Sequence, residues 1–229
     1  MSGPTLLKKI PFLSALTPAH LREVYRLARD VRLESGQKVF AKREDADAMF
    51  IVVAGRVKIF TDSAGKKRKT YAYLTEGEFF GEMALVEDLP RTASAQAVEP
   101  TRLLVIRKAD FQRLLARDSR LALYLLKTVC ARLRRANEDL EGMLFRNILG
   151  RVAQVVLDQA KRSGEPWKQG LALKERFTQQ ELADLVGTTR EPLTRALSSL
   201  RRAGLVGLTD DGRYAVPEPK KLAGLCSND

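Results

Sequence analysis

Residues 178–197 read Thr-Gln-Gln-Glu-Leu-Ala-Asp-Leu-Val-Gly-Thr-Thr-Arg-Glu-Pro-Leu-Thr-Arg-Ala-Leu, and this stretch decides the fold of the C-terminal part of the chain. Thr178 and Glu181 have the spacing of a capping box, in which each side chain accepts a hydrogen bond from the other residue's backbone N–H. A helix is therefore expected to begin there, and Gly187 is expected to provide the tight turn that ends it. The predicted buried face consists of Leu182, Ala183, Leu185 and Val186.

A second helix follows the turn, and Pro192 decides where it begins. With Thr188 as the N-cap, Pro192 would be the fourth helical residue and would remove the first intrahelical hydrogen bond. With Thr189 as the N-cap, the proline falls in the first turn, where the backbone donor has no helical partner. We therefore predict a helix capped by Thr189. Its inward stripe is Leu193, Ala196, Leu197 and Leu200.

The outward face of this second helix carries side chains that can read base edges. An arginine can pair with O6 and N7 of guanine, and a glutamate can accept from N4 of cytosine. The two-helix pattern and the polar first turn predict a helix-turn-helix that binds duplex DNA. The alternative is an ordinary helix surface, in which Glu191 and Arg195 form an i, i+4 ion pair. The predicted DNA-binding residues are Thr178, Gln179, Gln180, Thr189, Arg190, Glu191, Thr194 and Arg195.

Working outward from this motif, the flanking sequence predicts a separate C-terminal domain over residues 146–229. A helix is expected over residues 148–161, followed by a break at 163–166 and a short strand at 171–173. After the two motif helices, strands are expected at 205–208 and 214–216. Two short strands in this place form the wing of a winged helix-turn-helix.

Short strand-like runs fill the chain from about residue 36 to residue 106. Four of them, separated by turn residues, lie at 49–53, 57–60, 69–73 and 102–107. Strands this close together predict a sandwich or a barrel. Because 229 residues exceed the usual size of a single domain, we expect a first domain over residues 1–145.

After Asp110 the apolar period becomes helical, and a long helix is expected over about residues 110–144. Apolar residues recur there in alternating steps of three and four, as in the seam of a parallel coiled coil. Arg132 and other charged residues fill positions off the seam, which predicts a homodimer through this helix. The repeat covers fewer than three heptads, so a helix that packs on its own barrel is the alternative. The seam residues are Leu126, Val129, Leu133, Ala136, Leu140 and Met143.

Composition narrows the functional classes. The 40 lysines and arginines exceed the 28 aspartates and glutamates by 12, which indicates polyanionic partners or, alternatively, only a solvated basic surface. Two cysteines without CxxC spacing and one histidine give too few ligands for a zinc site or an iron–sulfur cluster, and little basis for haem or a catalytic triad. No metal is expected, and no enzyme is expected because no assembled nucleophile or paired acid stands out. No membrane partner is expected either, because no run approaches the roughly 20 apolar residues of a membrane helix. We expect a cytoplasmic protein.

A second motif lies in the predicted barrel, where residues 77–85 read Gly-Glu-Phe-Phe-Gly-Glu-Met-Ala-Leu and residues 90–93 read Pro-Arg-Thr-Ala. Gly81 allows close backbone approach, and a short helix beginning at Glu82 would direct free N–H groups at an anion. Arg91 can bond two phosphate oxygens at once. Taken alone, these residues indicate a glycine turn and a surface arginine more than a ligand site.

Both motifs resemble those of one family. The run 178–197 resembles the helix-turn-helix of the cyclic AMP receptor protein and fumarate–nitrate regulator family, and residues 77–93 resemble the phosphate-binding cassette of cyclic-nucleotide domains. The resemblance covers nearly the whole chain. It implies an α+β fold with an N-terminal double-stranded β-helix (jelly-roll) barrel, a long dimerisation helix and a C-terminal winged helix-turn-helix. It also implies a homodimeric transcription activator that binds double-stranded DNA and contacts RNA polymerase.

Within the family, the Arg-Glu-x-x-x-Arg arrangement implies the cyclic AMP receptor branch and half-sites like TGTGA. Arg190 and Arg195 would then lie on guanines and Glu191 opposite a cytosine. Thr194 and Pro192 depart from the commonest residues of that branch, which leaves the outer bases of the half-site open.

The resemblance also implies cyclic AMP as the effector, with Glu82 accepting from the ribose 2′-hydroxyl and Thr92 placed to bond a phosphate oxygen, or guanine where cyclic GMP is preferred. In related proteins two adjacent hydroxyl residues on the dimer helix touch the base, whereas here Ala136 and Asn137 stand in those positions. The asparagine amide can still accept from N6 of adenine. Two alternatives are a regulator of this fold that needs no ligand and a regulatory module of a kinase or channel. The implied nucleotide-binding residues are Gly81, Glu82, Met83, Ala84, Arg91, Thr92, Ala136 and Asn137.

Overall fold

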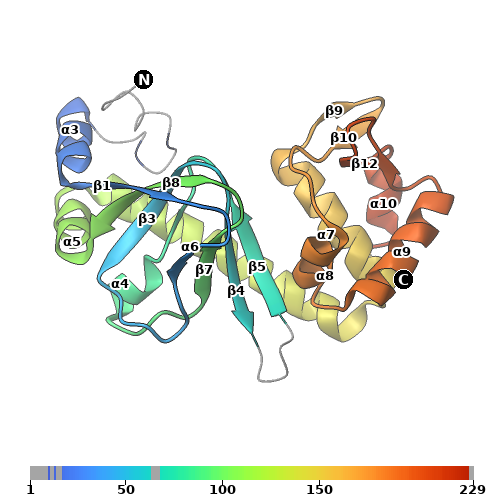
Figure 1. The fold of residues 1–229 in the computed structure, drawn as a ribbon, viewed down its shortest axis with the longest axis horizontal. Helices are drawn as coiled ribbons and strands as arrows, with labels where there is room; N and C mark the ends of the chain where they lie inside the picture. Colours follow the sequence, from blue (N-terminus) through green and yellow to red (C-terminus); the bar gives the residue numbers. More distant parts are fainter. Residues whose placement is uncertain (1–9, 11–12, 14–16, 63–67, 227–229) are drawn as a thin grey trace. The chain divides into compact units, whose positions relative to one another are not determined.

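The structure is a computed structural model that describes residues 10, 13, 17–62 and 68–226. The chain divides into two compact units, Met1–Arg132 and Leu133–Asp229. The division falls inside the long helix α6 (Ser119–Phe145), and the domain boundary expected at residues 145 and 146 stays a prediction. Figure 1 shows the elements of each unit in chain order.

The N-terminal unit contains two four-stranded antiparallel sheets. The first has the order β1 (Arg29–Leu33), β8 (Thr101–Arg107), β3 (Ala48–Ala54), β6 (Phe79–Phe80). The second has the order β2 (Lys38–Phe40), β7 (Ser94–Ala97), β4 (Val57–Asp62), β5 (Arg68–Leu74). Both sheets contribute to one core, which confirms the predicted barrel. That core contains Phe40, Val52, Val57, Leu74, Phe80, Ala95 and Leu103.

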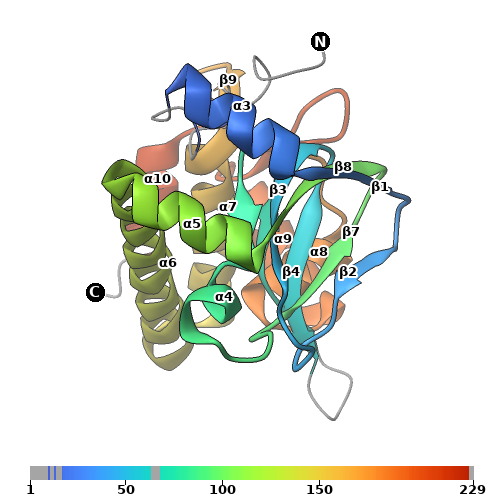
Figure 2. The ribbon, with the colours of Figure 1, turned by 90° about the vertical axis from the view of Figure 1, so that its left-hand side faces the viewer.

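The two central strands of the first sheet, β3 and β8, are largely buried on both faces. On β8, Leu103 points into the barrel core while its neighbour Leu104 points into a second core, where α3 (Pro18–Leu27), α5 (Lys108–Arg117) and the start of α6 pack. Figure 2 shows α3 and α5 lying along this sheet. Burial on both faces explains why β3 and β8 read as continuous apolar runs, which made them recognisable in the sequence.

All four predicted strands in this unit are confirmed, as β3, β4, β5 and β8. The prediction that strands begin at about residue 36 is wrong, because β1 starts at Arg29 and pairs with β8 along its whole length. This strand was missed because it reads Arg-Asp-Val-Arg-Leu and lies at the edge of its sheet, where three of its five residues are exposed. Edge strands tolerate charged residues that hide their pattern.

The predicted helix over about residues 110–144 requires a correction, because the structure divides this stretch at Asp118 into α5 and α6. Asp118 has extended backbone angles, and its Oδ1 accepts a hydrogen bond at 3.0 Å from the backbone N–H of Arg120. The carboxylate therefore satisfies one of the free donors at the start of α6. The apolar period continues across the break, so periodicity alone did not reveal it.

Most of the predicted seam residues on α6 are exposed. Leu126, Leu133 and Leu140 are 58%, 60% and 57% exposed, and Met143 is 45% exposed. Val129 is the exception, because it is partly buried and packs against the core of the N-terminal unit. The described residues therefore leave an apolar stripe on α6 in contact with solvent.

Besides the end of α6, the described part of the C-terminal unit combines four helices with a four-stranded antiparallel sheet. The helices are α7 (Ile148–Ser163), α8 (Gln179–Val186), α9 (Arg190–Arg202) and α10 (Pro219–Gly224). The sheet has the order β11 (Gly207–Leu208), β12 (Tyr214–Val216), β10 (Gly170–Ala172), β9 (Glu165–Trp167). This arrangement confirms the predicted winged helix-turn-helix. In the described part of the chain no helix has the length and apolar character needed to cross a membrane.

Candidate functional site

The helix-turn-helix begins with the predicted capping box. Thr178 Oγ1 accepts from the backbone N–H of Glu181 at 3.2 Å, and Glu181 Oε2 accepts from the backbone N–H of Thr178 at 2.8 Å. The helix α8 ends at Gly187, whose φ of 76° lies in the left-handed region that favours glycine. Arg151 of α7 donates to the carbonyl of Val186 at 2.8 Å and to that of Gly187 at 3.3 Å. The turn between α8 and α9 is therefore held from outside the motif.

The helix α9 begins at Arg190 with Thr189 as its N-cap residue, which confirms the choice between the two threonines. Thr189 has extended backbone angles, but its side chain makes no capping hydrogen bond. Pro192 is the third helical residue, and the backbone N–H of Leu193 donates to the Thr189 carbonyl at 3.4 Å. The proline therefore lies where it removes no helical bond.

One face of α9 is buried and the other is exposed to solvent. Leu193, Ala196, Leu197 and Leu200 are at most 5% exposed. Arg190, Glu191 and Arg195 are exposed, and Arg195 Nη1 donates to Glu191 Oε1 at 3.1 Å. The ion pair considered as the alternative thus exists. Its two side chains are 71% and 80% exposed, and pairs of this kind contribute only about 0.3–0.5 kcal/mol. Base edges can therefore replace it at little cost.

Gln179 joins α8 to α9, a link that the sequence did not reveal. Its Oε1 accepts from Thr194 Oγ1 at 2.9 Å and from Arg190 Nε at 3.4 Å. Gln180 instead donates to Asp184 on its own helix at 2.8 Å. Three of the predicted DNA-binding residues therefore form one cluster. The five other members of the predicted set are all exposed: Thr178, Gln180, Thr189, Glu191 and Arg195.

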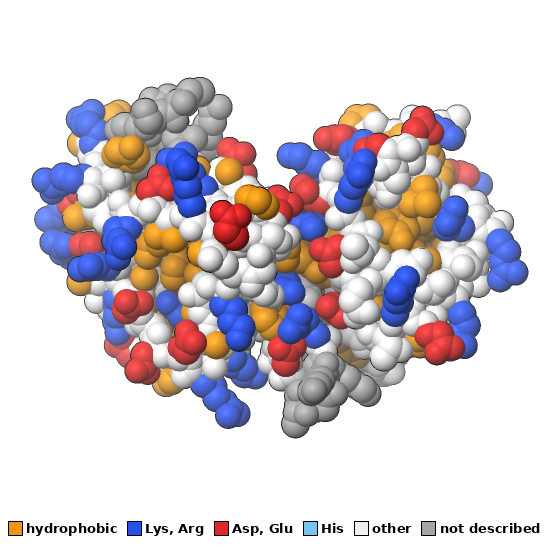
Figure 3. Space-filling model, in the orientation of Figure 1, with side chains coloured by type: hydrophobic (Ala, Val, Ile, Leu, Met, Phe, Trp, Pro, Cys, Tyr) orange, Lys and Arg blue, Asp and Glu red, His pale blue; other side chains and the backbone are white. Residues whose placement is uncertain are grey.

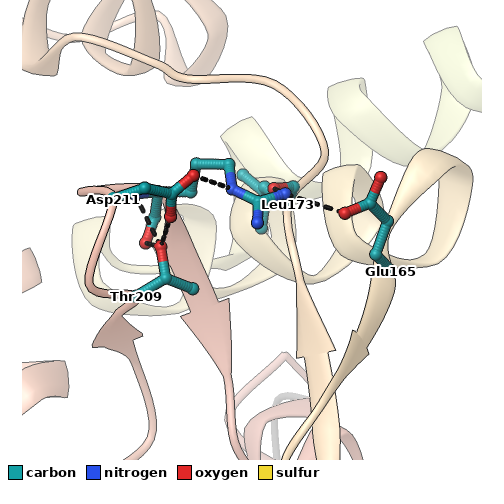
Figure 4. A network of polar contacts seen from close by, with 5 residues as sticks. Glu165, Leu173, Thr209 and Asp211 are labelled. Carbon is teal, nitrogen blue, oxygen red and sulfur yellow. Dashed lines mark hydrogen bonds and ion pairs between the residues drawn. The ribbon is translucent and has the colours of Figure 1, made fainter.

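Arg213 ties the wing turn to β9 and to Leu173, which follows β10, and Figure 4 shows this polar network with Glu165, Leu173, Thr209 and Asp211 labelled. Arg213 Nε donates to Asp211 Oδ2 at 2.7 Å, and Nη1 donates to Glu165 Oε2 at 2.9 Å and to the Leu173 carbonyl at 3.3 Å. Thr209 donates to Asp211 as well. This hydrogen bond and the charge of Arg213 hold the pKa of Asp211 below its ordinary value. The polar network fixes the hairpin that follows α9.

The second motif forms the turn between β6 and the short helix α4 (Met83–Glu87). Gly81 has a φ of 83°, and a Cβ added there would lie 2.8 Å from Arg91 Nη1. Arg91 is 4% exposed, its guanidinium lies 4.2 Å from the centre of the Phe40 ring, and it donates to the carbonyls of Gly81 at 2.7 Å and Ala48 at 2.6 Å. Glycine is therefore required where the backbone meets the arginine.

Two buried atoms at this turn have no hydrogen-bond partner: Arg91 Nε and Glu82 Oε2. An arginine has five N–H donors, of which Arg91 uses two on the carbonyls above. Burial lowers the pKa of Arg91, and the charges of Asp47 and Glu82 oppose that effect. Unsatisfied buried polar atoms are costly, so this pair fits a ligand that brings both an anionic oxygen and a hydroxyl donor.

Arg132 of α6 completes this site and was not predicted. Its Nη1 donates to Glu82 Oε1 at 2.6 Å, and its Nη2 donates to the Phe79 carbonyl at 2.6 Å. Arg132 was expected only as one of the charged residues off the seam, whereas in the structure it pairs with the buried Glu82. The available signal was its spacing of three from Val129, which puts both residues on the side of α6 that packs against the N-terminal core.

The remaining predicted nucleotide-binding residues differ in exposure. Met83 is 42% exposed and Ala84 is 4% exposed, and both lie in the first turn of α4, where backbone N–H groups have no helical acceptor. Thr92 is exposed. Ala136 and Asn137 lie on α6 in the other unit and are exposed, and their contact with a nucleotide stays a prediction. Among the described residues, no group of three His, Cys, Asp or Glu side chains could hold a metal ion.

Comparison with known proteins agrees with this geometry. Residues 30–118 match the cyclic nucleotide-binding domain family, and residues 150–225 match the Crp-like helix-turn-helix domain family. The chain is 32% identical to the cyclic AMP receptor protein of Thermus thermophilus over 88% of this chain and 90% of that protein. The chain belongs to the cyclic AMP receptor protein and fumarate–nitrate regulator family. As a member of this family it is a DNA-binding transcription regulator and not an enzyme.

Solved structures of other proteins share its fold. CooA from Carboxydothermus hydrogenoformans, solved as a double mutant, has a TM-score of 0.77 at 22% identity and covers 88% of this chain and 89% of its own. CLP from Xanthomonas campestris, described as a c-di-GMP responsive global regulator, has a TM-score of 0.70 at 26% identity and covers 85% of this chain and 96% of its own. Both comparisons extend over the two units of the regulator.

Proposed function

We propose that this regulator is a homodimer that reads TGTGA-like palindromic DNA and that cyclic AMP controls its affinity for that DNA. One observation carries the proposal of ligand control. Arg91 Nε and Glu82 Oε2 are buried without partners beside Gly81, whose φ of 83° favours glycine. The protein therefore maintains an unfilled donor and an unfilled acceptor in the matched family motif.

The reading of DNA rests on α9. Its exposed Arg190 and Arg195 would pair with guanines, and Glu191 would accept from a cytosine. The net charge of +12 supports attraction to a polyanion. Figure 3 shows lysine and arginine side chains on the surface of both units, with a gathering over α3 and β1. These charges raise affinity for any duplex, while the α9 side chains supply sequence preference.

Cyclic AMP would bring a phosphate, a ribose hydroxyl and an adenine edge. Arg91 would hold the phosphate together with the backbone of Gly81, Met83 and Ala84 and the hydroxyl of Thr92. Glu82 would accept from the 2′-hydroxyl, while Arg132 keeps its other oxygen in place. Ala136 and Asn137 are proposed to face the adenine edge.

The homodimer rests on the exposed stripe of α6. Burial of a leucine side chain stabilises a protein by about 1.5–3 kcal/mol. Three leucines on the stripe are each more than half exposed, so pairing of two such helices can bury them. Pairing of two such helices would place the two α9 helices on successive major grooves, about one duplex turn apart. Ligand control is then a population shift between dimer arrangements, limited by how differently the ligand binds to each. Cytoplasmic location and activation through contacts with RNA polymerase are inferred from the family alone.

Two observations favour c-di-GMP as a second candidate effector. The hydroxyl pair that touches the base in related proteins is replaced by Ala136 and Asn137, and CLP is described as responding to c-di-GMP. A regulator that needs no ligand remains the other alternative.

Isothermal titration calorimetry of the full chain with cyclic AMP tests the proposal, with cyclic GMP, c-di-GMP and 5′-AMP as comparison ligands. Binding to a TGTGA palindrome is measured by fluorescence anisotropy with and without cyclic AMP. We expect binding heat with cyclic AMP and tighter DNA binding in its presence. No heat at millimolar cyclic AMP, together with tight DNA binding, would show that the ligand has no role. Unchanged DNA binding by Arg190→Ala would indicate a protein-docking module instead.

A further inference from the structure

Gln179, Arg190 and Thr194 form one hydrogen-bonded group, which we call the α8–α9 cluster. Gln179 Oε1 lies 3.4 Å from Arg190 Nε and 2.9 Å from Thr194 Oγ1. Thr194 Oγ1 also lies 2.8 Å from the carbonyl of Arg190, four residues earlier on α9. Gln179 and Thr194 are half-buried, whereas Arg190 is exposed. The exposed Arg190 side chain is thus bonded to Gln179, and Thr194 contacts the same oxygen of Gln179.

We infer that Gln179 and Thr194 are positioning residues that determine how strongly Arg190 selects guanine. This inference rests on the proposed reading of guanine by Arg190. The guanidinium has two edges that can bond a base, and Gln179 Oε1 occupies its Nε donor. Only the edge formed by Nη1 and Nη2 then remains for O6 and N7 of guanine. A side chain held in one orientation also loses less rotamer entropy on binding.

Thr194 acts through this cluster and supplies no donor to a base. Its hydroxyl has a single hydrogen, and both acceptors within reach, Gln179 Oε1 and the Arg190 carbonyl, belong to the protein. The same contact explains the orientation of the Gln179 amide. Its oxygen faces two donors, so its NH₂ group points away from them. Position 194 was expected to contact DNA, and the cluster reassigns it to holding the amide.

A phosphate contact by Gln179 is the competing role. The residue stands in the first turn of α8, where polar side chains often bond the DNA backbone. Loss of a phosphate contact weakens binding to every sequence by the same factor. Loss of a positioning contact weakens the preference for one base and leaves the affinity for other sequences nearly unchanged. The two roles therefore give different results with the same variant.

The test measures base preference with the full-length protein in saturating cyclic AMP. Fluorescence anisotropy compares a TGTGA palindrome with duplexes in which one guanine of each half-site is replaced by adenine. Arg190→Ala identifies the guanine that Arg190 reads. At that guanine we expect Gln179→Ala and Thr194→Val to lower the preference about three- to tenfold, a part of the roughly 5- to 150-fold that a good arginine–guanine pair provides. At the other guanine and on random duplex we expect changes below about twofold.

Three controls keep the result specific to the cluster. Thr194→Ser retains the hydroxyl and should restore the preference that Thr194→Val loses. Gln180→Ala removes the neighbouring amide, which bonds Asp184 and not Arg190, so any loss should be uniform across sequences. Gln179→Ala should have no further effect on preference when Arg190 is already alanine. Thermal melting followed by circular dichroism confirms that each variant is folded.

The outcomes separate this inference from the proposed function. Uniform weakening by Gln179→Ala, or an unchanged guanine preference in both Gln179→Ala and Thr194→Val, would overturn the positioning role alone. If Arg190→Ala keeps the preference at both guanines, or if the wild-type protein has none, the proposed DNA reading fails and the positioning role fails with it.

Discussion

Arg132 Nη1 lies 2.6 Å from Oε1 of Glu82, a carboxylate whose side chain is only 2% exposed. The same guanidinium bonds the Phe79 carbonyl and lies 5.1 Å from the centre of the Phe79 ring. The long helix therefore contacts the turn of the proposed nucleotide site through a buried charge. One oxygen of Glu82 is held by the protein, and the other has no partner.

Arg132→Leu should destabilise the protein because it leaves a buried carboxylate without its ion pair. We expect the free energy of unfolding to fall by about 1–3 kcal/mol, below the usual cost of breaking a buried pair because Arg132 is 37% exposed. Chemical denaturation followed by circular dichroism measures the change. In a Glu82→Gln background the same substitution should cost much less. Arg134→Leu, an exposed arginine on the same helix, is the control, and equal losses in both variants would contradict the role of the pair.

The pH dependence of stability provides a second test, at Asp158 of α7. Burial raises the pKa of Asp158 above its ordinary value of 3.8, although a hydrogen bond from Gln154 opposes the shift. Below the ordinary value the carboxyl is protonated in both the folded and the unfolded protein, so it does not affect the free energy of unfolding. As the pH rises through the folded-state pKa, the folded protein must hold a partly buried charge and loses stability.

Asp158→Asn should therefore raise the melting temperature at neutral pH, and the gain should shrink as the pH falls from the raised folded-state pKa toward the ordinary pKa of aspartate, below which it should be absent. The amide oxygen can still accept from Gln154, so the hydrogen bond is kept. Melting curves at several pH values measure the difference. Asp210→Asn, at an exposed position in the wing turn, controls for loss of a carboxylate. A variant that is less stable than the wild type at neutral pH would show that the charged form is favoured.

The wing provides a third prediction. Arg213→Ala removes the bonds that join the wing turn to β9 and β10, and the melting temperature should fall by about 2–4 °C. The pKa of Asp211 is lowered by its bond to Thr209 and by Arg213, so its contribution is present above its ordinary pKa and lost as the pH falls through the folded value. Hydrogen exchange at Thr209 and Gly212 should report the loosened turn. Lys220→Ala, at an exposed position, is the control, and equal exchange in both variants would exclude a structural role for Arg213.

Local signals in the sequence were sufficient to predict the helix-turn-helix. The Thr178 capping box, the turn glycine and Pro192 each act within a few residues, and the structure places α8 and α9 accordingly. The strands β3 and β8 were also predictable, because both of their faces are buried. The start of β1 was not, since an edge strand keeps charged residues on its exposed side.

Contacts between distant residues were not predictable from pattern alone. Arg132 bonds a residue 50 positions away and Arg213 one that is 48 positions away. The helical spacing of an arginine does not show which distant carboxylate will pair with it in the folded protein. The break at Asp118 was missed for a different reason, because an acidic residue within an apolar helical period fits a helix surface as well as a helix start.

The exposed stripe of α6 provides the last prediction, which tests the homodimer directly. Leu133 and Leu140 are each more than half exposed in the protomer, so a charge at either position costs the isolated fold little. In a two-stranded coiled coil, however, both positions face their counterparts, and like charges would meet at the seam. Each glutamate also removes a leucine whose burial contributes about 1.5–3 kcal/mol, once from each helix. We therefore expect Leu133→Glu to weaken the dimer at least about 100-fold.

Sedimentation velocity over a range of concentrations measures the shift to monomer. Ala131→Glu places the same charge at an exposed position on the opposite side of the helix and should leave the dimer intact. A Leu133→Glu protein that sediments as a stable dimer would show that the two protomers meet through another surface.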